Sequence, residues 1–134
     1  MGKNVFHVGG LGHGLAMKLI NNMLGQIATV AIAEALVFGK KAGLDPQKIY
    51  EVVRVSTGSS VQFENRVPRM LARNFVPGGT IDISYKDQEL ETSFAKHLGV
   101  PLLLADVTQQ VYQMARAAGP TVEPGGRVRR SSVP

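Results

Sequence analysis

The stretch GLAMKLINNMLGQIATVAIAEALVF, residues 14–38, determines what kind of fold this chain can form. It contains no proline, and its apolar residues recur every three or four positions, which is the spacing of one helix face. The members of that face are Leu15, Leu19, Met23, Ile27, Val30 and Val37. The stretch predicts a helix of about 25 residues and about 37 Å, long enough to be the central element of a small fold.

Start and stop signals after this stretch predict four shorter helices. Gly39 and Gly43 are expected to end the long helix, and Asp45-Pro46 is an N-cap followed by proline at the first helical position. Ser59 or Ser60 can cap a third helix, which Pro68 interrupts or restarts. The expected ranges are 45–55, 60–73, 85–97 and 101–118, with a loop over 74–84 and a stop at Gly119. The sequence therefore predicts an all-α, multi-helix bundle around one long central helix.

The apolar residues of the last two predicted helices indicate which faces should point inward. In the fourth helix these are Leu90, Phe94 and Leu98, and in the fifth they are Leu103, Val107, Val111, Met114 and Ala118.

The chain as a whole divides into three predicted segments. Residues 1–12 hold a short strand over 3–8 or the end of one, residues 13–119 form the helical domain, and residues 120–134 form a disordered tail.

Composition narrows the class of protein. The chain has 134 residues, 44% of them hydrophobic and 19% charged, which suits a globular domain. It has no cysteine, which excludes disulfides and thiolate metal sites, and its first residues lack a signal-peptide pattern. The apolar run over 23–38 contains Gln26 and Glu34 and is expected to fall short of a membrane span. These features predict a cytoplasmic protein with no membrane partner.

The formal charge of +5 raises the alternative of nucleic-acid binding. Arg127, Arg129 and Arg130 supply part of the excess from the predicted tail, and the other basic residues are dispersed among acidic ones. A solvated surface therefore explains the charge better than a nucleic-acid interface.

The glycines at the start of the long helix suggest a nucleotide-binding loop, but both common motifs fail. A dinucleotide-binding fingerprint needs a third glycine where Leu15 stands, and a second strand where this sequence continues as helix. A phosphate-binding P-loop needs Gly-Lys-Ser/Thr, whereas Lys18 lies between Met17 and Leu19.

What remains is a lysine and an asparagine near the start of a helix. Lys18 and Asn22 are four residues apart, so both project from one face. An amine beside an amide suits a site where a carboxylate is held while a hydroxyl loses its proton. From spacing alone, two ordinary surface residues on an exposed first turn are the favoured interpretation.

Three separated motifs change that balance. GGLGHGLAMKLINNML over 9–24, AIAEALVFGKKAGLD over 31–45 and YKDQELETSFAKHLGVPLLLAD over 85–106 together resemble the C-terminal domain of the β-hydroxyacid dehydrogenases. That family includes 3-hydroxyisobutyrate dehydrogenase and tartronate semialdehyde reductase. The resemblance covers about residues 1–119 and implies the helical fold of the 6-phosphogluconate dehydrogenase C-terminal domain.

The resemblance also implies roles for particular residues. Lys18 matches the family's catalytic lysine, which exchanges a proton with the substrate hydroxyl as a hydride moves to or from NAD or NADP. Asn22, with Asn21 and Gly14, would bind the substrate, a small hydroxycarboxylic acid, and Lys86 would contact the cofactor. Asp87 is expected to be a helix-start acid instead. The histidines form no set with metal-ligand spacing, so no metal is expected.

Two departures from the family pattern are visible. The family's N-terminal dinucleotide-binding domain is missing, and residues 1–12 resemble a remnant of its last strand. The chain alone is therefore expected to be inactive. Residues 120–134 do not match the family's ending.

Association into a homodimer or a higher homo-oligomer is expected through the long helix. The alternative is a helical oligomerisation module without catalysis.

Overall fold

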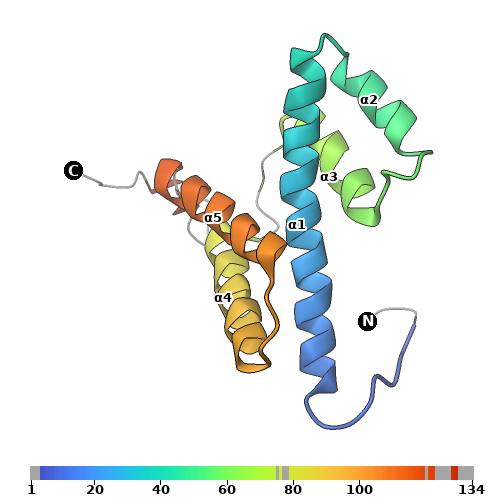
Figure 1. The fold of residues 1–134 in the computed structure, drawn as a ribbon. Helices are drawn as coiled ribbons and strands as arrows, with labels where there is room; N and C mark the ends of the chain where they lie inside the picture. The colour runs from blue at the N-terminus through green and yellow to red at the C-terminus, as the bar shows by residue number, and fades with distance from the viewer. Residues whose placement is uncertain (1–3, 75, 77–78, 120, 123–127, 130–134) are drawn as a thin grey trace.

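The computed structural model of the chain describes residues 4–74, 76, 79–119, 121–122 and 128–129. Five helices follow one another, and a short antiparallel strand pair follows them (Figure 1). The elements are α1 (His13–Lys41), α2 (Pro46–Val53), α3 (Val61–Leu71), α4 (Ile81–His97), α5 (Leu103–Ala118), β1 (Thr121–Val122) and β2 (Val128–Arg129). The predicted all-helical fold around one long central helix is confirmed.

The two ends of the chain are described only in part. Residues 4–9 form neither helix nor strand, so the strand expected over 3–8 is absent from its described portion. A single extended segment needs a neighbouring strand for its backbone hydrogen bonds, and none lies beside residues 4–9 in the described chain. Most of the predicted tail lies outside the described residues, and β1 and β2 are the parts of it that the structure describes.

Helix α1 begins and ends at glycine-dependent turns. Gly12 precedes it with a φ of 86°, and Gly43 follows it with a φ of 88°, a region where glycine is favoured over other residues. The predicted stop at Gly39 is wrong, because α1 continues through this buried residue to Lys41. A Cβ at Gly39 would collide with the side chain of Ile49, so the missing side chain lets α2 approach.

The other helices form two groups along α1. Helices α2 and α3 pack on its C-terminal half, and α4 and α5 pack as a pair beside its N-terminal half and middle (Figure 1). Ile32, Phe63 and Val67 form the buried apolar cluster of the first group, and the ring of Tyr50 stacks on Phe63 with centroids 5.9 Å apart. Helix α1 thereby joins two groups of helices, and both groups reach its middle turns.

The helix caps explain where the shorter helices begin. The Asp45 carboxylate accepts a hydrogen bond from the Gln47 amide, and the Ser60 hydroxyl accepts one from the Phe63 amide, as predicted. Helix α4 begins four residues before the predicted start because Thr80 caps it, accepting from the Ile83 amide at 3.3 Å. The expected loop over 74–84 is therefore wrong for its last four residues.

The side of α4 and α5 that faces inward is the reverse of the predicted one. The buried residues of α4 are Gln88, Glu91, Thr92 and Ala95, and those of α5 are Ala105 and Thr108. Most of the predicted inward residues are exposed instead, among them Phe94 at 42%, Leu103 at 75% and Met114 at 69%, whereas Val111 is half-buried. The predicted apolar stripe of each helix therefore faces mostly away from α1, and Val111 is the exception, since it lines a pocket with Val30 and Ala33 of α1.

Helix α1 also has a long apolar surface. Its most apolar 18-residue window has a mean hydropathy of 1.4, so by length and composition it could cross a membrane. Of the residues in that window, 17% are buried. The expectation that this run falls short of a membrane span is therefore not met on length and composition alone. However, α1 packs against each of the other four helices and makes polar contacts with α4. We therefore interpret it as the central helix of a bundle.

Candidate functional site

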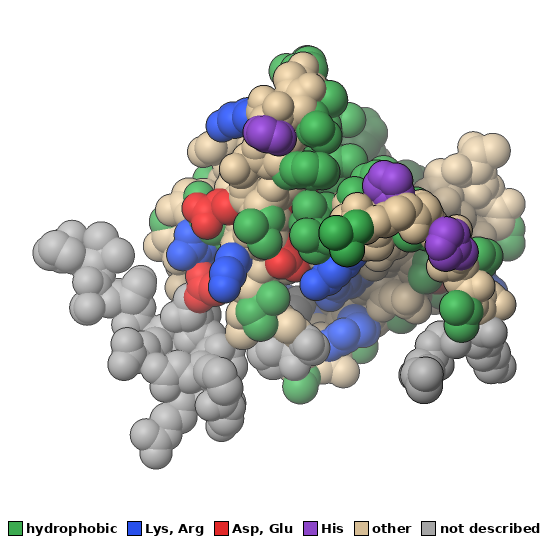
Figure 2. Space-filling view, turned by 90° about the horizontal axis from the view of Figure 1, so that it is seen from below, with side chains coloured by type: hydrophobic (Ala, Val, Ile, Leu, Met, Phe, Trp, Pro, Cys, Tyr) green, Lys and Arg blue, Asp and Glu red, His purple; other side chains and the backbone are tan. Residues whose placement is uncertain are grey.

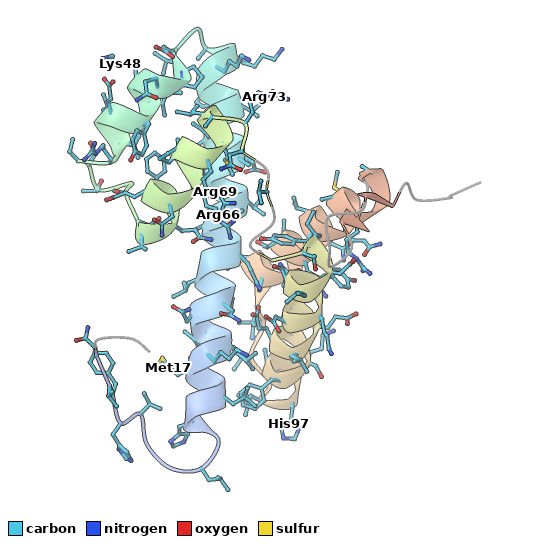
Figure 3. The ribbon with its side chains drawn as sticks, turned by 180° about the vertical axis from the view of Figure 1, so that it is seen from behind. Met17, Lys48, Arg66, Arg69, Arg73 and His97 are labelled. Atoms are coloured by element: carbon cyan, nitrogen blue, oxygen red, sulfur yellow. The ribbon has the colours of Figure 1, made fainter. Side chains whose placement is uncertain are left out.

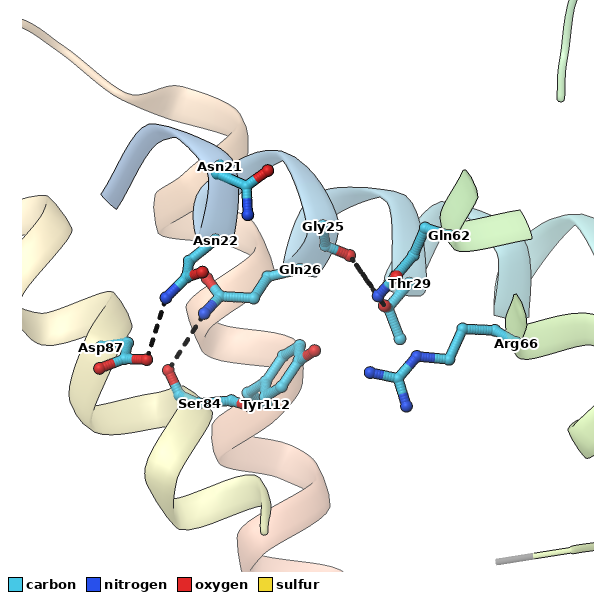
Figure 4. A pocket seen from close by; sticks show the side chains of 10 residues that line it. All are labelled: Asn21, Asn22, Gly25, Gln26, Thr29, Gln62, Arg66, Ser84, Asp87 and Tyr112. Atoms are coloured by element: carbon cyan, nitrogen blue, oxygen red, sulfur yellow. Dashed lines mark hydrogen bonds between the residues drawn. The ribbon is translucent and has the colours of Figure 1, made fainter. Parts of the chain in front are cut away.

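A polar cleft lies where α1, α3, α4 and α5 meet (Figure 4). Its volume is about 290 Å³. Its lining consists mainly of carboxamides and hydroxyls, with one guanidinium and one carboxylate. The lining residues are Asn21, Asn22, Gly25, Gln26, Thr29, Gln62, Arg66, Ser84, Asp87 and Tyr112. Such a lining suits a small polar ligand that forms several hydrogen bonds.

One stripe of α1 forms the floor of this cleft. Asn22, Gln26 and Thr29 follow one another at helical spacing and all line it. Gly25 lies between them, and its carbonyl oxygen accepts a hydrogen bond from the Thr29 hydroxyl at 2.8 Å. Lys18 lies one turn before Asn22 on the same stripe, about 6 Å away along the helix axis. Asn22 therefore lies at the N-terminal end of the cleft, and Lys18 lies one turn beyond it, outside the lining.

The amide of Asn22 is fixed by a residue of α4. Its Nδ2 donates to Oδ2 of Asp87 at 3.2 Å, and the neighbouring Gln26 donates to the backbone oxygen of Ser84 at 3.4 Å (Figure 4). The expectation that Asp87 is a helix-start acid is wrong, because α4 begins at Ile81 and Asp82 occupies its first turn. Asp87 instead holds Asn22 in place and leaves its second N–H and its carbonyl oxygen available.

The opposite wall of the cleft comes from α3 and α5. The Gln62 side chain donates to the Thr29 hydroxyl at 3.0 Å and to the Gly25 carbonyl at 3.3 Å. Arg66, one turn further along α3, extends its guanidinium into the cleft toward Tyr112 (Figure 4). Burial raises the pKa of the Tyr112 phenol, and the Thr29 hydroxyl offsets part of that rise. Tyr112 is therefore a neutral hydroxyl in this wall at neutral pH.

The other predicted site residues lie outside the cleft lining. Asn21 and Asn22 line the cleft, whereas Lys18 and Lys86 are exposed and do not. Neither lysine makes a hydrogen bond or an ion pair with any residue that the structure describes. Gly14 lies in the first turn of α1, and a Cβ built there would meet no atom within 4 Å. This glycine turn and the two lysine side chains are thus open to a ligand or to another protein surface.

Beside the cleft, α4 buries a carboxyl group without a partner. Glu91 is 4% exposed, and neither of its carboxyl oxygens has a hydrogen-bond partner in the described chain. The side-chain amide of Gln88 is buried and unpaired in the same way. Burial, together with the nearby Asp87 carboxylate, raises the pKa of Glu91 from 4.5 to about 7.

Several residues of the cleft were missed by the sequence analysis. Gln26 and Thr29 continue the spacing of Lys18 and Asn22, so extending that stripe by two turns would have found them. Gln62, Arg66, Ser84 and Tyr112 come from three other helices. No spacing within the sequence indicates that they meet, because the packing of α3, α4 and α5 on α1 brings them together.

Comparisons with known proteins agree with this arrangement. Residues 12–123 match the sequence profile of a family described as "NAD-binding of NADP-dependent 3-hydroxyisobutyrate dehydrogenase". The chain is 38% identical over 108 residues to L-threonate dehydrogenase of Cupriavidus necator, covering 81% of this chain and 36% of that protein. It is 34% identical over 120 residues to 2-(hydroxymethyl)glutarate dehydrogenase of Eubacterium barkeri, covering 89% of this chain and 40% of that one.

A solved structure has the same fold. The crystal structure of 3-hydroxyisobutyrate dehydrogenase from Salmonella typhimurium superposes with a TM-score of 0.83 at 31% identity, covering 94% of this chain and 43% of that one. The fold and the family profile point to the same class, the NAD(P)-dependent 3-hydroxyacid dehydrogenases. The chain belongs to the 3-hydroxyisobutyrate dehydrogenase-like family, as its motifs indicated. It spans about two fifths of the length of the relatives it matches.

The family's cofactor is NAD or NADP, and the described residues fit part of such a ligand. A Cβ built at Gly12 or at Gly14 would meet open space, so there is room beside this turn, and the exposed Lys86 side chain suits a polar or anionic group. The described residues contain no parallel strands, which usually carry the rest of a dinucleotide site.

Proposed function

We propose that this chain is the substrate-binding and oligomerisation domain of an NAD(P)-dependent dehydrogenase that oxidises a small hydroxy acid or reduces the corresponding carbonyl compound. The observation that carries the proposal is the Asn22–Asp87 hydrogen bond, because it orients a carboxamide at the mouth of a polar cleft, one turn from Lys18. Membership of the family supports the reaction class. A partner domain would supply the remainder of the nucleotide site.

In this proposal the proton and the hydride leave the substrate along different routes. The Lys18 amine accepts the proton of the substrate hydroxyl, and the carbon that carried the hydroxyl becomes a carbonyl carbon. The bound nicotinamide supplies the hydride chemistry. In the reverse direction Lys18 returns the proton to the carbonyl oxygen. The exposure of Lys18 is consistent with a group that a second domain covers when the site closes.

Asn22 has the complementary task of holding the substrate carboxylate. The second N–H of its amide donates to a carboxylate oxygen, while Asp87 keeps the amide from rotating. Asn21 lines the same end of the cleft and is proposed as an additional contact. Lys86 precedes Asp87 in the sequence and is exposed on α4. We propose that it contacts the cofactor from the outer side of this helix.

The proposal is tested by restoring a nucleotide domain. We define the two-domain protein as this chain joined at Met1 to a dinucleotide-binding domain of the same family. It is expected to form NAD(P)H from at least one small hydroxy acid, whereas the 134-residue chain alone is expected to form none. A two-domain protein that binds NAD(P) but oxidises no hydroxy acid would favour the alternative, a helical oligomerisation module without catalysis.

We also propose that the chain forms a homodimer or a larger homo-oligomer. The outer faces of α4 and α5 and the N-terminal half of α1 leave large apolar side chains exposed, including Leu24, Phe94, Leu103 and Met114. Met17 lies on the side of α1 away from α4 (Figure 3), and hydrophobic side chains lie open on the face seen in Figure 2. Large exposed apolar patches are rare on proteins that stay monomeric, and where they occur they usually mark an interface with another molecule.

Sedimentation equilibrium of the chain tests this assembly. A dimer or larger species is expected, with dissociation on replacing Leu103 by glutamate on the exposed face. The matched control is Val55→Glu, which changes an exposed residue beyond α2 and should leave the mass unchanged. A wild-type chain that stays monomeric at all accessible concentrations contradicts the proposal.

A further inference from the structure

Helix α4 carries two carboxyl groups one turn apart, Asp87 in the cleft lining and Glu91 beside the cleft. Residues four apart on a helix project from the same face, about 6 Å from each other along the axis. Asp87 accepts a hydrogen bond from Asn22, whereas neither oxygen of Glu91 has a partner in the described chain. The Asn22 end of the cleft therefore has one carboxylate at its surface and a second carboxyl group buried close behind it.

Neither α4 nor α1 offers Glu91 an ion pair among the described residues. Of the side chains three or four positions away from Glu91 on α4, the one that can carry a charge is Asp87, whose charge is negative. The cleft residues of α1 are uncharged, and Lys18 is exposed one turn beyond them. Burial, together with the Asp87 carboxylate, raises the pKa of Glu91 to about 7.

Helices α5 and α3 bring one titratable and one positively charged group into the cleft, Tyr112 and Arg66. Burial is the largest cause of the raised Tyr112 pKa, and the charges of Arg66 and Glu91 act on the phenol in opposite directions. The other charged residues of α5 act elsewhere, because Arg116 forms an ion pair at the start of α4 and Asp106 is exposed. A negative charge on Glu91 therefore acts across the cleft, although its side chain lies outside the lining.

The proposed function, on which this inference rests, brings the substrate carboxylate to Asn22, next to these two carboxyl groups. Like charges held close together in a poorly hydrated site disfavour one another. We propose that Glu91 is a positioning residue that holds a proton while the substrate carboxylate is bound, so that Asp87 alone carries a negative charge in the lining and keeps Asn22 oriented. An ionised Glu91 has to take up a proton from solvent when the acid binds. The affinity for the acid therefore falls as Glu91 loses its proton.

Titration of Glu91 in the 134-residue chain tests this coupling without catalysis. The glutamate carboxyl carbons are isotopically labelled and followed by NMR as the pH changes, and the signal missing from Glu91→Gln identifies Glu91. Adding 3-hydroxyisobutyrate to saturation is expected to raise the midpoint of this titration by about 0.5–1 pH unit. By reciprocity, the ionised form then binds the acid about three- to tenfold more weakly. The amide of the same acid is the matched ligand, and it should leave the midpoint unchanged because it has no charge.

Two results of the titration overturn the inference. One is a midpoint that does not rise at the highest soluble concentration of the acid, and the other is an equal rise with the amide. If the two-domain protein still oxidises a hydroxy acid in either case, the proposed function stands without this role for Glu91. A midpoint that rises with the acid alone, without turnover, supports the role of Glu91 and contradicts the proposed function.

The pH dependence of KM in the two-domain protein gives an independent test. Between about pH 6 and about pH 8, the KM for the hydroxy acid is expected to rise about two- to fivefold more in wild type than in Glu91→Gln. The pH profile of kcat at saturating acid should be the same in both, because saturation removes the binding effect. Glu89→Gln, which replaces an exposed carboxyl group of the same helix, should keep the wild-type KM profile. Identical KM profiles for wild type and Glu91→Gln overturn the inference.

Discussion

Replacing Lys18 by methionine in the two-domain protein is expected to lower kcat by about 10²–10⁴-fold, the range that a positioned general acid or base contributes. Methionine keeps the length of the side chain but removes the amine that exchanges the proton. Because Lys18 is exposed on α1 and makes no hydrogen bond or ion pair with a described residue, the change should leave the fold intact. The measurement is the rate of NAD(P)H formation at saturating hydroxy acid.

Lys40→Met is the matched control for this experiment. Lys40 is an exposed lysine of the same helix, in its last turn and far from the cleft. Its replacement should change kcat by less than about twofold. If Lys18→Met also retains kcat within that range, the amine does not move the proton, and the assignment of the reacting end of the cleft is wrong.

Replacing Glu91 by glutamine is expected to stabilise the chain at alkaline pH but not at acidic pH. The pKa of this buried carboxyl group is raised from 4.5 to about 7, so the folded chain holds a proton that the unfolded chain releases between these values. Its favourable contribution is complete below about pH 4.5 and is lost as the pH rises through about 7. At about 1.4 kcal/mol per pKa unit, the loss is at most about 3.5 kcal/mol.

The measurement is urea unfolding of wild type and variant at about pH 4 and about pH 8. Glu91→Gln should match wild type at the lower pH and exceed its free energy of unfolding by about 2–3 kcal/mol at the higher one. Glu89→Gln, an exposed neighbour on α4, provides the control for a change of net charge. A difference between Glu91→Gln and wild type that is the same at both pH values contradicts the account of this buried carboxyl group.

The helices were predictable because their signals are local. Spacing of apolar residues gave α1, and the side-chain caps Asp45 and Ser60 gave the starts of α2 and α3. The start of α4 was missed because Thr80 follows a glycine-rich turn that suggests a loop. The error at Gly39 has another cause, since the contact with Ile49 that keeps this glycine within the helix is tertiary.

The orientation of α4 and α5 could not be predicted from their sequences. Periodicity locates an apolar stripe but does not say what covers it. In this chain Leu103 and Phe94 face outward, while Glu91 and Thr108 face inward. The pattern agrees with a helix pair whose apolar side packs on another copy of the chain, as we propose, and a single sequence does not distinguish this from an internal core.

The candidate site was likewise predictable only along one helix. Lys18 and Asn22 share a stripe of α1, so their spacing and the family motif were sufficient to single them out. The role of Asp87 was missed because it depends on the packing of α4 beside α1. Asp87 lies 65 residues after its partner Asn22 in the sequence. Arg66 and Tyr112 belong to the site for the same reason, through the packing of α3 and α5.

The central claim is that the mouth of this cleft, between Lys18 and Asn22, holds the reacting end of a hydroxy acid. A crystal structure of the two-domain protein with NAD(P) and a hydroxy acid bound measures this directly. The account predicts a carboxylate oxygen within hydrogen-bond distance of Nδ2 of Asn22, with the reacting hydroxyl at the same distance from Nζ of Lys18. A hydroxy acid bound beside the nicotinamide but out of reach of both side chains would contradict the account.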